Sequence, residues 1–317
     1  MRRAAISLLL LGSACSPRAD RGVGVGPDTL VVFEAASLSV PMKAVFDSFA
    51  RRSVPAVIVQ EEHGGSLELA RRVTELHRVP DVIALADQEV FPQLLMPGSA
   101  RWYAAFARNR MVVAYTPRSR HAAEITSANW RSVVLRTDVL LGRPDPLLAP
   151  AGYRALLVYR LAEHFYGAPG LAARLDARTP PRLMRSNAAE LAVLLAAGEL
   201  DYIIEYESLA RANHFRYVVL PPEIDLGDEG HAATYAQASV RVARGMDTVE
   251  LRGAPILYAV SIPVAAPHAR VGERFLQFLL GPQGRLMLRA SNVDALDHPV
   301  LHGVMIPESI RASTLPR

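Results

Sequence analysis

Serine side chains stand at two places where an expected strand leads directly into an expected helix. The first strand ends in Ala35-Ala36-Ser37-Leu38-Ser39, and the second ends in His63-Gly64-Gly65-Ser66. Such a serine suits a helix N-cap, which is its ordinary role. A hydroxyl beside the unpaired N–H groups of a helix N-terminus also forms a neutral receptor for an anion, which the helix dipole strengthens. Because two successive strand–helix units share this arrangement, and the Gly-Gly pair lets a ligand approach the backbone, we favour an anion receptor.

Two later junctions offer further helix N-termini. The proline-rich stretch from Pro144 to Arg154 opens one helix, and Arg185-Ser186-Asn187 precedes another. Ligands of parallel α/β sheets bind at the carboxyl ends of the strands, where such junctions gather. We therefore expect these junctions to face the same cleft as the two serine junctions.

Glu205 is the most unusual polar residue, because it lies inside the apolar stretch Tyr202-Ile203-Ile204-Glu205-Tyr206. Burying a carboxylate without a partner is costly. Glu205 is therefore either strained in the core or placed at a functional strand end, and we prefer the functional position.

Alternating strand and helix patterns must position these junctions. Apolar runs predict strands at 29–35, 56–59, 81–86, 111–115, 202–206, 217–220, 238–242 and 256–262. Helical spacing of apolar residues predicts helices at 41–52, 67–78, 153–164, 188–197, 270–280 and 283–290. Strands that alternate with helices indicate βαβ units and mainly parallel sheets. A chain of 317 residues is long enough for two such α/β lobes.

The N-terminus predicts export and a lipid anchor. Met1-Arg2-Arg3 precedes an apolar run and then Gly12-Ser13-Ala14-Cys15, which is the pattern of a secretory signal too short to span a bilayer. Cys15 is the single cysteine of the chain and resembles the acylated cysteine of a bacterial lipobox. We expect a signal peptide at 1–14 and a lipidated cysteine with its tether at 15–27. An ordinary signal peptide with an incidental cysteine is the alternative.

The composition excludes several classes of partner and metal site. Lys+Arg 35 against Asp+Glu 31 gives a net charge of +4, but the arginines are scattered among acids, so we expect no nucleic-acid partner. A single cysteine excludes internal disulfides and cysteine-based zinc or iron–sulfur sites. His298 and His302 have a spacing that can hold zinc, but Pro299 separates them and no third ligand is evident, so we interpret them as solvated tail histidines.

A serine hydrolase is the alternative from the enzyme class. No serine stands in a Gly-x-Ser-x-Gly elbow, and Ser39 lies four residues from Lys43 rather than the three of a Ser-x-x-Lys pair. P-loop and dinucleotide fingerprints are also missing. We therefore expect that the protein is not an enzyme.

The chain resembles the periplasmic tungstate- and molybdate-binding proteins of ABC importers, most closely the tungstate-binding group. The resemblance runs from about residue 31 to residue 288 and rests on several ordered stretches. These are Ala35 to Pro41, Gly65-Ser66, Pro80 to Ala84, Met96-Pro97, Trp102 to Asn109 with Met111-Val112, Pro150 to Arg154, Ala197 to Tyr202 and Tyr217 to Leu226.

The resemblance implies a type II periplasmic-binding-protein fold, with two α/β lobes, a hinge and a ligand cleft between the lobes. One lobe would combine 28–111 with 263–317, including a C-terminal tail after about residue 312, and the other would span 112–262. Crossings at Met111–Tyr115 and Ala254–Ser261 would form the hinge that lets the lobes close.

The resemblance also implies which residues bind the ligand. The hydroxyls of Ser37 and Ser66 match positions that hold the anion's oxygens. Backbone groups of the site lie at Ala36, Ala149, Pro150, Ala151 and Asn187, with the N–H groups of Ala36, Ala151 and Asn187 as donors. Glu205 matches a carboxylate that coordinates the metal centre of the anion, a bond that would offset the repulsion between a carboxylate and a dianion.

One departure from the family concerns the second ligand carboxylate. Family members usually carry Asp-Pro-Cys-Gly-Tyr-Arg where this chain has Ala149-Pro150-Ala151-Gly152-Tyr153-Arg154. The carboxylate is absent at Ala149, and Asp145, four residues upstream, is a candidate substitute. Six-coordinate binding and a preference for tungstate over molybdate are therefore open.

We expect an extracytoplasmic solute-binding lipoprotein that captures molybdate or tungstate for the permease subunits of an ABC importer. It would need no cofactor, act as a monomer and touch the membrane only through its lipid anchor. Two alternatives are the same fold with sulfate or phosphate as ligand, and a non-transport adaptor whose site has decayed.

Overall fold

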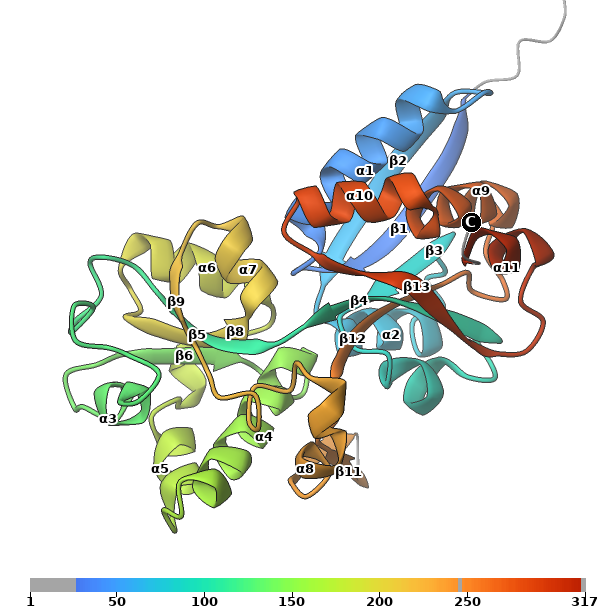
Figure 1. Cartoon of the computed structure of the whole chain (residues 1–317). Coiled ribbons are helices and arrows are strands. Elements are labelled where there is room, and N and C mark those ends of the chain that lie inside the picture. Colours follow the sequence, from blue (N-terminus) through green and yellow to red (C-terminus); the bar gives the residue numbers. More distant parts are fainter. Residues whose placement is uncertain (1–26, 245–246, 315–317) are drawn as a thin grey trace, which may run out of the picture.

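Two α/β lobes make up the protein, each built on its own sheet (Figure 1). The structure is a computed structural model that describes residues 27–244 and 247–314. The predicted signal peptide, Cys15 and all of the tether but its last residue lie outside the described residues. Within the described ranges, no helix combines the length and the apolar character needed to cross a membrane.

The first lobe contains a six-stranded mixed sheet in the order β13-β4-β12-β3-β1-β2. Its strands are β1 (Asp28–Ala35), β2 (Val57–Gly64), β3 (Val82–Leu85), β4 (Trp102–Asn109), β12 (Ile256–Ser261) and β13 (Asp294–Gly303). Helices on one face are α1 (Ser39–Arg52), α9 (Ala269–Leu280) and α10 (Pro282–Ala290), and α2 (Ser66–Thr74) lies on the other (Figure 1). A π-helical turn, η1 (Phe91–Leu95), packs on α2, and α11 (Glu308–Thr314) packs on α9.

The second lobe contains a five-stranded sheet in the order β7-β6-β8-β5-β9. Its strands are β5 (Met111–Tyr115), β6 (Leu141–Pro144), β7 (Met184–Arg185), β8 (Tyr202–Tyr206) and β9 (Arg216–Val219). Helices α6 (Ala188–Ala197) and α7 (Glu207–Ala212) lie on one face, and α4 (Pro150–Phe165), α5 (Leu171–Ala177) and α3 (Trp130–Val134) lie on the other side (Figure 1). After a short helix α8 (Ala232–Tyr235), the hairpin of β10 (Ser239–Arg244) and β11 (Asp247–Arg252) packs on α4 through β10.

The chain passes between the sheets at two neighbouring places. Only Arg110 separates β4 from β5, so one extended segment runs from the first lobe into the second (Figure 1). Beside it, the carbonyl of Asp225 accepts from the Met111 N–H at 2.8 Å, and the carbonyl of Leu226 accepts from the Ile256 N–H at 2.8 Å. The expected hinge would lie at these crossings, at Arg110 and at residues 253–255, because there the described chain leaves one sheet for another.

Strand pairing corrects two expectations. The expectation of mainly parallel sheets was wrong, because β12 and β13 run antiparallel to their neighbours in the first sheet and β5 does so in the second. Apolar runs report that a strand is buried but not the direction of its partner. In addition, β12 belongs to the first sheet, so the lobe boundary lies before Ile256, whereas the sequence placed 112–262 in the second lobe.

The strand β13 changes the interpretation of the two C-terminal histidines. They lie on an antiparallel strand and not on a helix, so they are not the helical zinc pair that their spacing allows. His302 stacks on Tyr103 with ring centroids 4.6 Å apart. This pair of rings belongs to the packing of the first lobe.

Candidate functional site

A small cavity of about 20 Å³ lies where the two lobes meet. All eight residues assigned to the site from the sequence line it, namely Ala36, Ser37, Ser66, Ala149, Pro150, Ala151, Asn187 and Glu205. The cavity exceeds the roughly 10–15 Å³ that a single water needs. It is far below the several hundred Å³ typical of pockets for organic ligands. Its size therefore suits one compact ion.

Strand–helix junctions supply the walls of this cavity. Ser37 follows β1, Ser66 begins α2, Pro150 begins α4, and Asn187 is the N-cap of α6. Four junctions that lie far apart in the chain thus point helix N-termini at one place, because both sheets present strand ends to the space between the lobes. Helix N-termini carry partial positive charge, so this arrangement favours a negative ligand.

The two serine hydroxyls are oriented by neighbours that donate to them. The Oγ of Ser66 accepts from the Ala86 N–H at 3.0 Å, and the Oγ of Ser37 accepts from the Tyr258 hydroxyl at 3.2 Å. Each oxygen therefore has a lone pair engaged, and its own proton is free to be donated to a ligand. Both side chains are buried, with exposed fractions of 5% for Ser37 and 1% for Ser66.

Backbone N–H groups supply further donors, with one correction. The Ala36 N–H donates to the Gly64 carbonyl at 2.9 Å. This N–H is therefore used by the β1–β2 pairing. The prediction that it is a free donor to the ligand was wrong. Among the described residues, the N–H groups of Ser37, Ser66, Ala151 and Asn187 donate to no other backbone group.

Asn187 directs its side chain away from this role. Its Oδ1 accepts from the Glu190 N–H at 3.1 Å, and its Nδ2 donates to Glu190 at 2.9 Å. The side chain therefore caps α6, as in an ordinary N-cap. Only the backbone of Asn187 is left to face the cavity.

Glu205 is fully buried on β8 and lines the cavity. Its Oε1 accepts from the Tyr206 N–H at 2.9 Å, whereas its Oε2 has no hydrogen-bond partner among the described residues. Burial raises the pKa of this carboxyl to about 8. The free-energy cost of burying this group would be relieved if the carboxyl were protonated and neutral at pH 7, or if the carboxylate were bonded to a cationic centre.

Asp145, the candidate substitute for the missing carboxylate, does not line the cavity. Ala149 is the N-cap residue of α4 and presents a methyl group to the cavity. Asp145 is not among the residues that line it, and its Oδ1 accepts from the Leu147 N–H at 2.8 Å. Within the described chain, Glu205 is thus the only acidic residue that lines the cavity, and no Lys, Arg or His lines it.

Contacts between the lobes enclose the cavity. The Leu148 carbonyl, next to α4, accepts from the Leu67 and Glu68 N–H groups of α2 at 3.2 and 3.3 Å. In addition, Arg154 of α4 forms a buried ion pair with Asp87 of the first lobe, with Nη2 and Oδ2 2.8 Å apart. The Tyr153 hydroxyl also donates to Asp87. The lobes are therefore closed on each other around the site.

A second, larger hollow of about 550 Å³ lies beside the crossing segments. Its charged residues include Arg110, whose Nε lies 2.6 Å from Glu207, and Asp225, which is 3.9 Å from Arg110. These charges compensate one another, so we assign no ligand to this hollow.

Tyr258 and Asp87 belong to the site's support and were not found from the sequence. Tyr258 lies on β12, and Asp87 lies two residues after the end of β3. Tyr258 donates a hydrogen bond to Ser37, and Asp87 forms an ion pair with Arg154, so each contacts a residue far away in the chain. Local patterns carry no signal for such long-range partners.

Two α/β lobes that meet around a small cavity define a binding protein of the type II periplasmic fold. The sequence matches the bacterial extracellular solute-binding protein family over residues 30–291. The chain belongs to this family, which confirms the class of protein indicated by the sequence resemblance. The family is described as one of extracellular solute-binding proteins, so this chain is a solute-binding protein of that family.

Individual relatives agree with this assignment. An uncharacterised solute-binding protein of Petrotoga mobilis is 40% identical over 273 residues, covering 85% of this chain and 84% of its own. The molybdate/tungstate-binding protein WtpA of Thermococcus kodakarensis is 33% identical over 308 residues, covering 89% of this chain and 86% of its own. Among solved structures, the periplasmic molybdate-binding protein of Azotobacter vinelandii has a TM-score of 0.58 at 16% identity, over 83% of this chain and 98% of that one.

Proposed function

We propose that this protein captures molybdate or tungstate and delivers it to the permease subunits of an ABC importer. The observation that carries the proposal is the cavity between the lobes, where neutral donors from four helix N-termini meet the unpartnered Oε2 of Glu205. The relative from Thermococcus kodakarensis, whose name states that it binds molybdate or tungstate, supports this choice of ligand.

Neutral donors suit a fully deprotonated oxyanion. Every oxygen of such an anion accepts hydrogen bonds. The backbone N–H of Ala151 is a donor only, and the hydroxyls of Ser37 and Ser66, which already accept a hydrogen bond each, have a proton to donate. No cationic side chain of the described residues lines the cavity, so fixed dipoles and hydroxyls compensate the charge. A compact anion is favoured over a larger anionic metabolite by the cavity's volume of about 20 Å³.

Glu205 would distinguish molybdate and tungstate from other tetrahedral anions. Molybdenum and tungsten can accept further oxygen ligands, whereas the sulfur of sulfate and the phosphorus of phosphate cannot do so readily. A bond from Oε2 to the metal centre would turn a repulsive contact into an attractive one. Because Ala149 stands in place of a second carboxylate, Glu205 is in this proposal the single side chain that bonds to the metal centre of the anion.

Sulfate or phosphate is the second candidate ligand, and one observation favours it. The pKa of Glu205 is raised to about 8 by burial, so the neutral acid could lie beside a tetrahedral anion without bonding to its centre. In that case the carboxyl would contribute a hydrogen bond and no discrimination by coordination.

The anchor and the assembly complete the proposal. Acylation at Cys15 would hold the protein to a membrane through the tether, and the closed lobes would act as a monomer. Incorporation of radiolabelled fatty acid tests this anchor, because Cys15→Ser should abolish labelling and leave anion binding unchanged.

Substitution of the serines tests the site itself. Ser37→Ala and Ser66→Ala each remove a donor to a charged ligand, a contact worth about 1.5–3 kcal/mol, so tungstate affinity should fall about 10- to 100-fold in calorimetric titrations. Ser39→Ala is the matched control, because the Ser39 hydroxyl donates to the Ala36 carbonyl at 2.9 Å and Ser39 does not line the cavity. Equal effects of all three substitutions would contradict the assignment of the site.

A further inference from the structure

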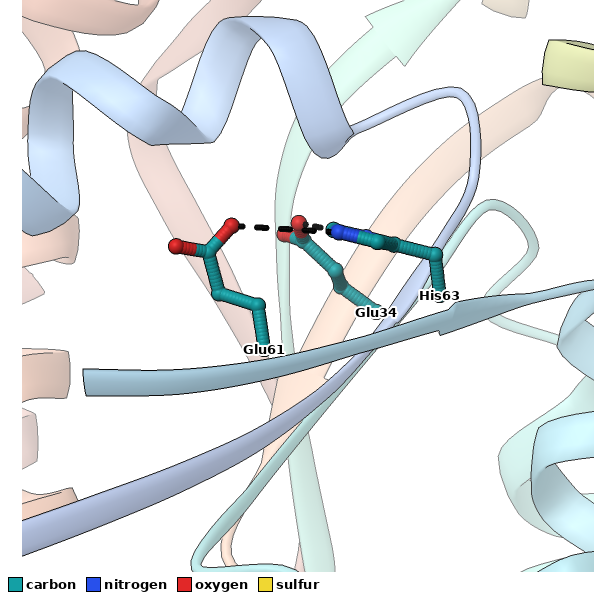
Figure 2. Close-up of side chains that lie close together, drawn as sticks. All are labelled: Glu34, Glu61 and His63. Atoms are coloured by element: carbon teal, nitrogen blue, oxygen red, sulfur yellow. Dashed lines mark ion pairs between the residues drawn. The ribbon is translucent and has the colours of Figure 1, made fainter.

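A second cluster of ligand-forming side chains lies outside the anion cavity, on the neighbouring strands β1 and β2. Glu34 of β1 is paired in register with His63 of β2, and Glu61 stands two residues before His63 on the same strand. Residues paired in register, and residues two apart on a strand, project from the same face of a sheet. Figure 2 shows that the three side chains project to one side and converge.

The distances within the cluster are short. The Nδ1 of His63 lies 3.1 Å from Oε1 of Glu34, and the Nε2 of His63 lies 3.9 Å from Oε2 of Glu61. One ligand atom from each residue can be chosen so that all three lie within 4.8 Å of one another. Ligand atoms around a zinc ion, at about 2.0–2.2 Å from the metal, are roughly 3–4 Å apart. Small movements of the side chains would therefore complete the geometry.

Glu34 is the residue whose burial needs an explanation. Its side chain is 0% exposed, and neither carboxylate oxygen has a hydrogen-bond partner among the described residues. The Nδ1 of His63 lies 3.1 Å from Oε1, which is close enough for an ion pair when the imidazole is protonated. Buried carboxylates are normally hydrogen-bonded, paired or coordinated to a metal, because an uncompensated one is costly. This buried acid has no hydrogen bond within the described part of the chain and lies beside an imidazole and a second carboxylate, and the arrangement points to a bound cation.

We propose that Glu34, Glu61 and His63 bind one divalent transition-metal ion, with one ligand atom from each side chain. An imidazole with two carboxylates suits zinc and neighbouring first-row metals, whereas calcium and magnesium prefer oxygen ligands alone. The His63 side chain is 41% exposed and that of Glu61 is 25% exposed, so the site is open to solvent on one side. Water would complete the coordination, and the metal can enter from that side.

The site adjoins the anion cavity through the backbone. Glu34 precedes Ala35 and His63 precedes Gly64, and both of these neighbours line the cavity. A metal bound across β1 and β2 would therefore hold together the two strand ends that carry Ser37 and Ser66. The proposal does not depend on the identity of the anion, because its ligands are separate from the cavity.

An ion pair between a protonated His63 and Glu34 is the competing explanation, and metal titration separates the two. The untagged full-length protein is treated with a chelator, dialysed and titrated with zinc chloride in the absence of oxyanions. We expect one zinc ion per chain, with affinity at least about 10-fold weaker in both His63→Gln and Glu34→Gln, because each substitution removes a direct ligand. Calcium should bind at least about 10-fold more weakly than zinc.

His121→Gln is the matched control. His121 also lies between two carboxylates, at 3.1 Å from Glu124 and 2.9 Å from Asp138. Its Nδ1, however, is in contact with the guanidinium of Arg136. Zinc affinity should be unchanged in this variant. Glu34→Gln keeps the shape of the side chain, and circular dichroism checks that it folds. Absence of stoichiometric zinc binding by the wild-type protein, or equal binding by wild type and His63→Gln, would overturn the proposal and leave a histidine ion pair only.

Discussion

Gly65 of the first lobe packs directly against the Leu148 carbonyl of the second. A Cβ atom placed at Gly65 would lie 2.2 Å from that oxygen, a distance that side chains do not adopt. The φ of Gly65 is −69°, so the glycine is required by this close approach and not by its backbone conformation. The same carbonyl accepts from the N–H groups at the start of α2. Closure of the lobes over the cavity thus depends on the absence of one methyl group.

The substitution Gly65→Ala tests this dependence. The added methyl group should hold the lobes apart and weaken tungstate binding by about 10-fold or more, which corresponds to about 1.4 kcal/mol. Because the contact lies between lobes, the fold of each lobe should persist, and the far-ultraviolet circular dichroism should not change. Calorimetric titration measures the affinity.

Gly98→Ala provides the control for that experiment, because a Cβ at Gly98 meets nothing within 4 Å. It should bind tungstate like the wild-type protein. If Gly65→Ala also bound normally, closure against Leu148 would not be part of binding.

Protonation of Glu205 predicts how stability depends on pH. Burial raises the pKa of this carboxyl from its ordinary value of 4.5 to about 8. Between these values the folded protein retains a proton that the unfolded chain has released, so the free energy of unfolding must fall as pH rises through this range. Glu205→Gln removes this fall in the free energy of unfolding, because the amide does not titrate. Relative to wild type, the variant should become more stable toward pH 8, by on the order of a few kcal/mol.

Urea denaturation near pH 5 and near pH 8 measures the difference. Glu34, whose pKa is raised to about 7 chiefly by burial, adds a dependence of the same sign to both proteins, so the comparison isolates Glu205. Parallel pH profiles for the two proteins would show that Glu205 titrates normally.

Ala149 allows the missing carboxylate to be restored. It is 6% exposed and lines the cavity with Glu205, so Ala149→Asp places a second acid beside the ligand. A metal centre that can accept another oxygen ligand should be bound more tightly, whereas sulfate should be bound more weakly through charge repulsion. Titration with both anions measures the two affinities, and an unchanged tungstate affinity would argue against coordination from this position.

Local sequence signals predicted the elements whose ends are marked by capping residues. Helix α6 has the predicted limits of 188–197, and in the structure Asn187 caps its start and Gly198, with φ 83°, ends it. The strand β8 was likewise predicted at its observed limits. The strands β4 and β13 were not predicted as such, because β13 contains Pro299 and a register shift and neither strand shows a simple apolar alternation.

The site was predictable as far as it depends on junction residues. Ser37, Ser66, Ala151 and Glu205 line one cavity, because strand ends of both lobes face the space between them; their binding of an anion stays a prediction. The loss of the Ala36 donor was not predictable, since it depends on pairing with Gly64. Nor could the sequence show that Asp145 is used in its own turn, because loop geometry decides this.

Calorimetric titration of wild-type protein and Glu205→Ala with tungstate, molybdate, sulfate and phosphate tests the central claim most directly. Coordination by Glu205 predicts that tungstate and molybdate bind wild type more tightly than the other two anions. It also predicts that the substitution weakens tungstate binding at least about 10-fold more than sulfate binding, a difference of about 1.4 kcal/mol. An equal loss for tungstate and sulfate would contradict coordination by Glu205, and flat traces with all four anions would contradict oxyanion transport itself.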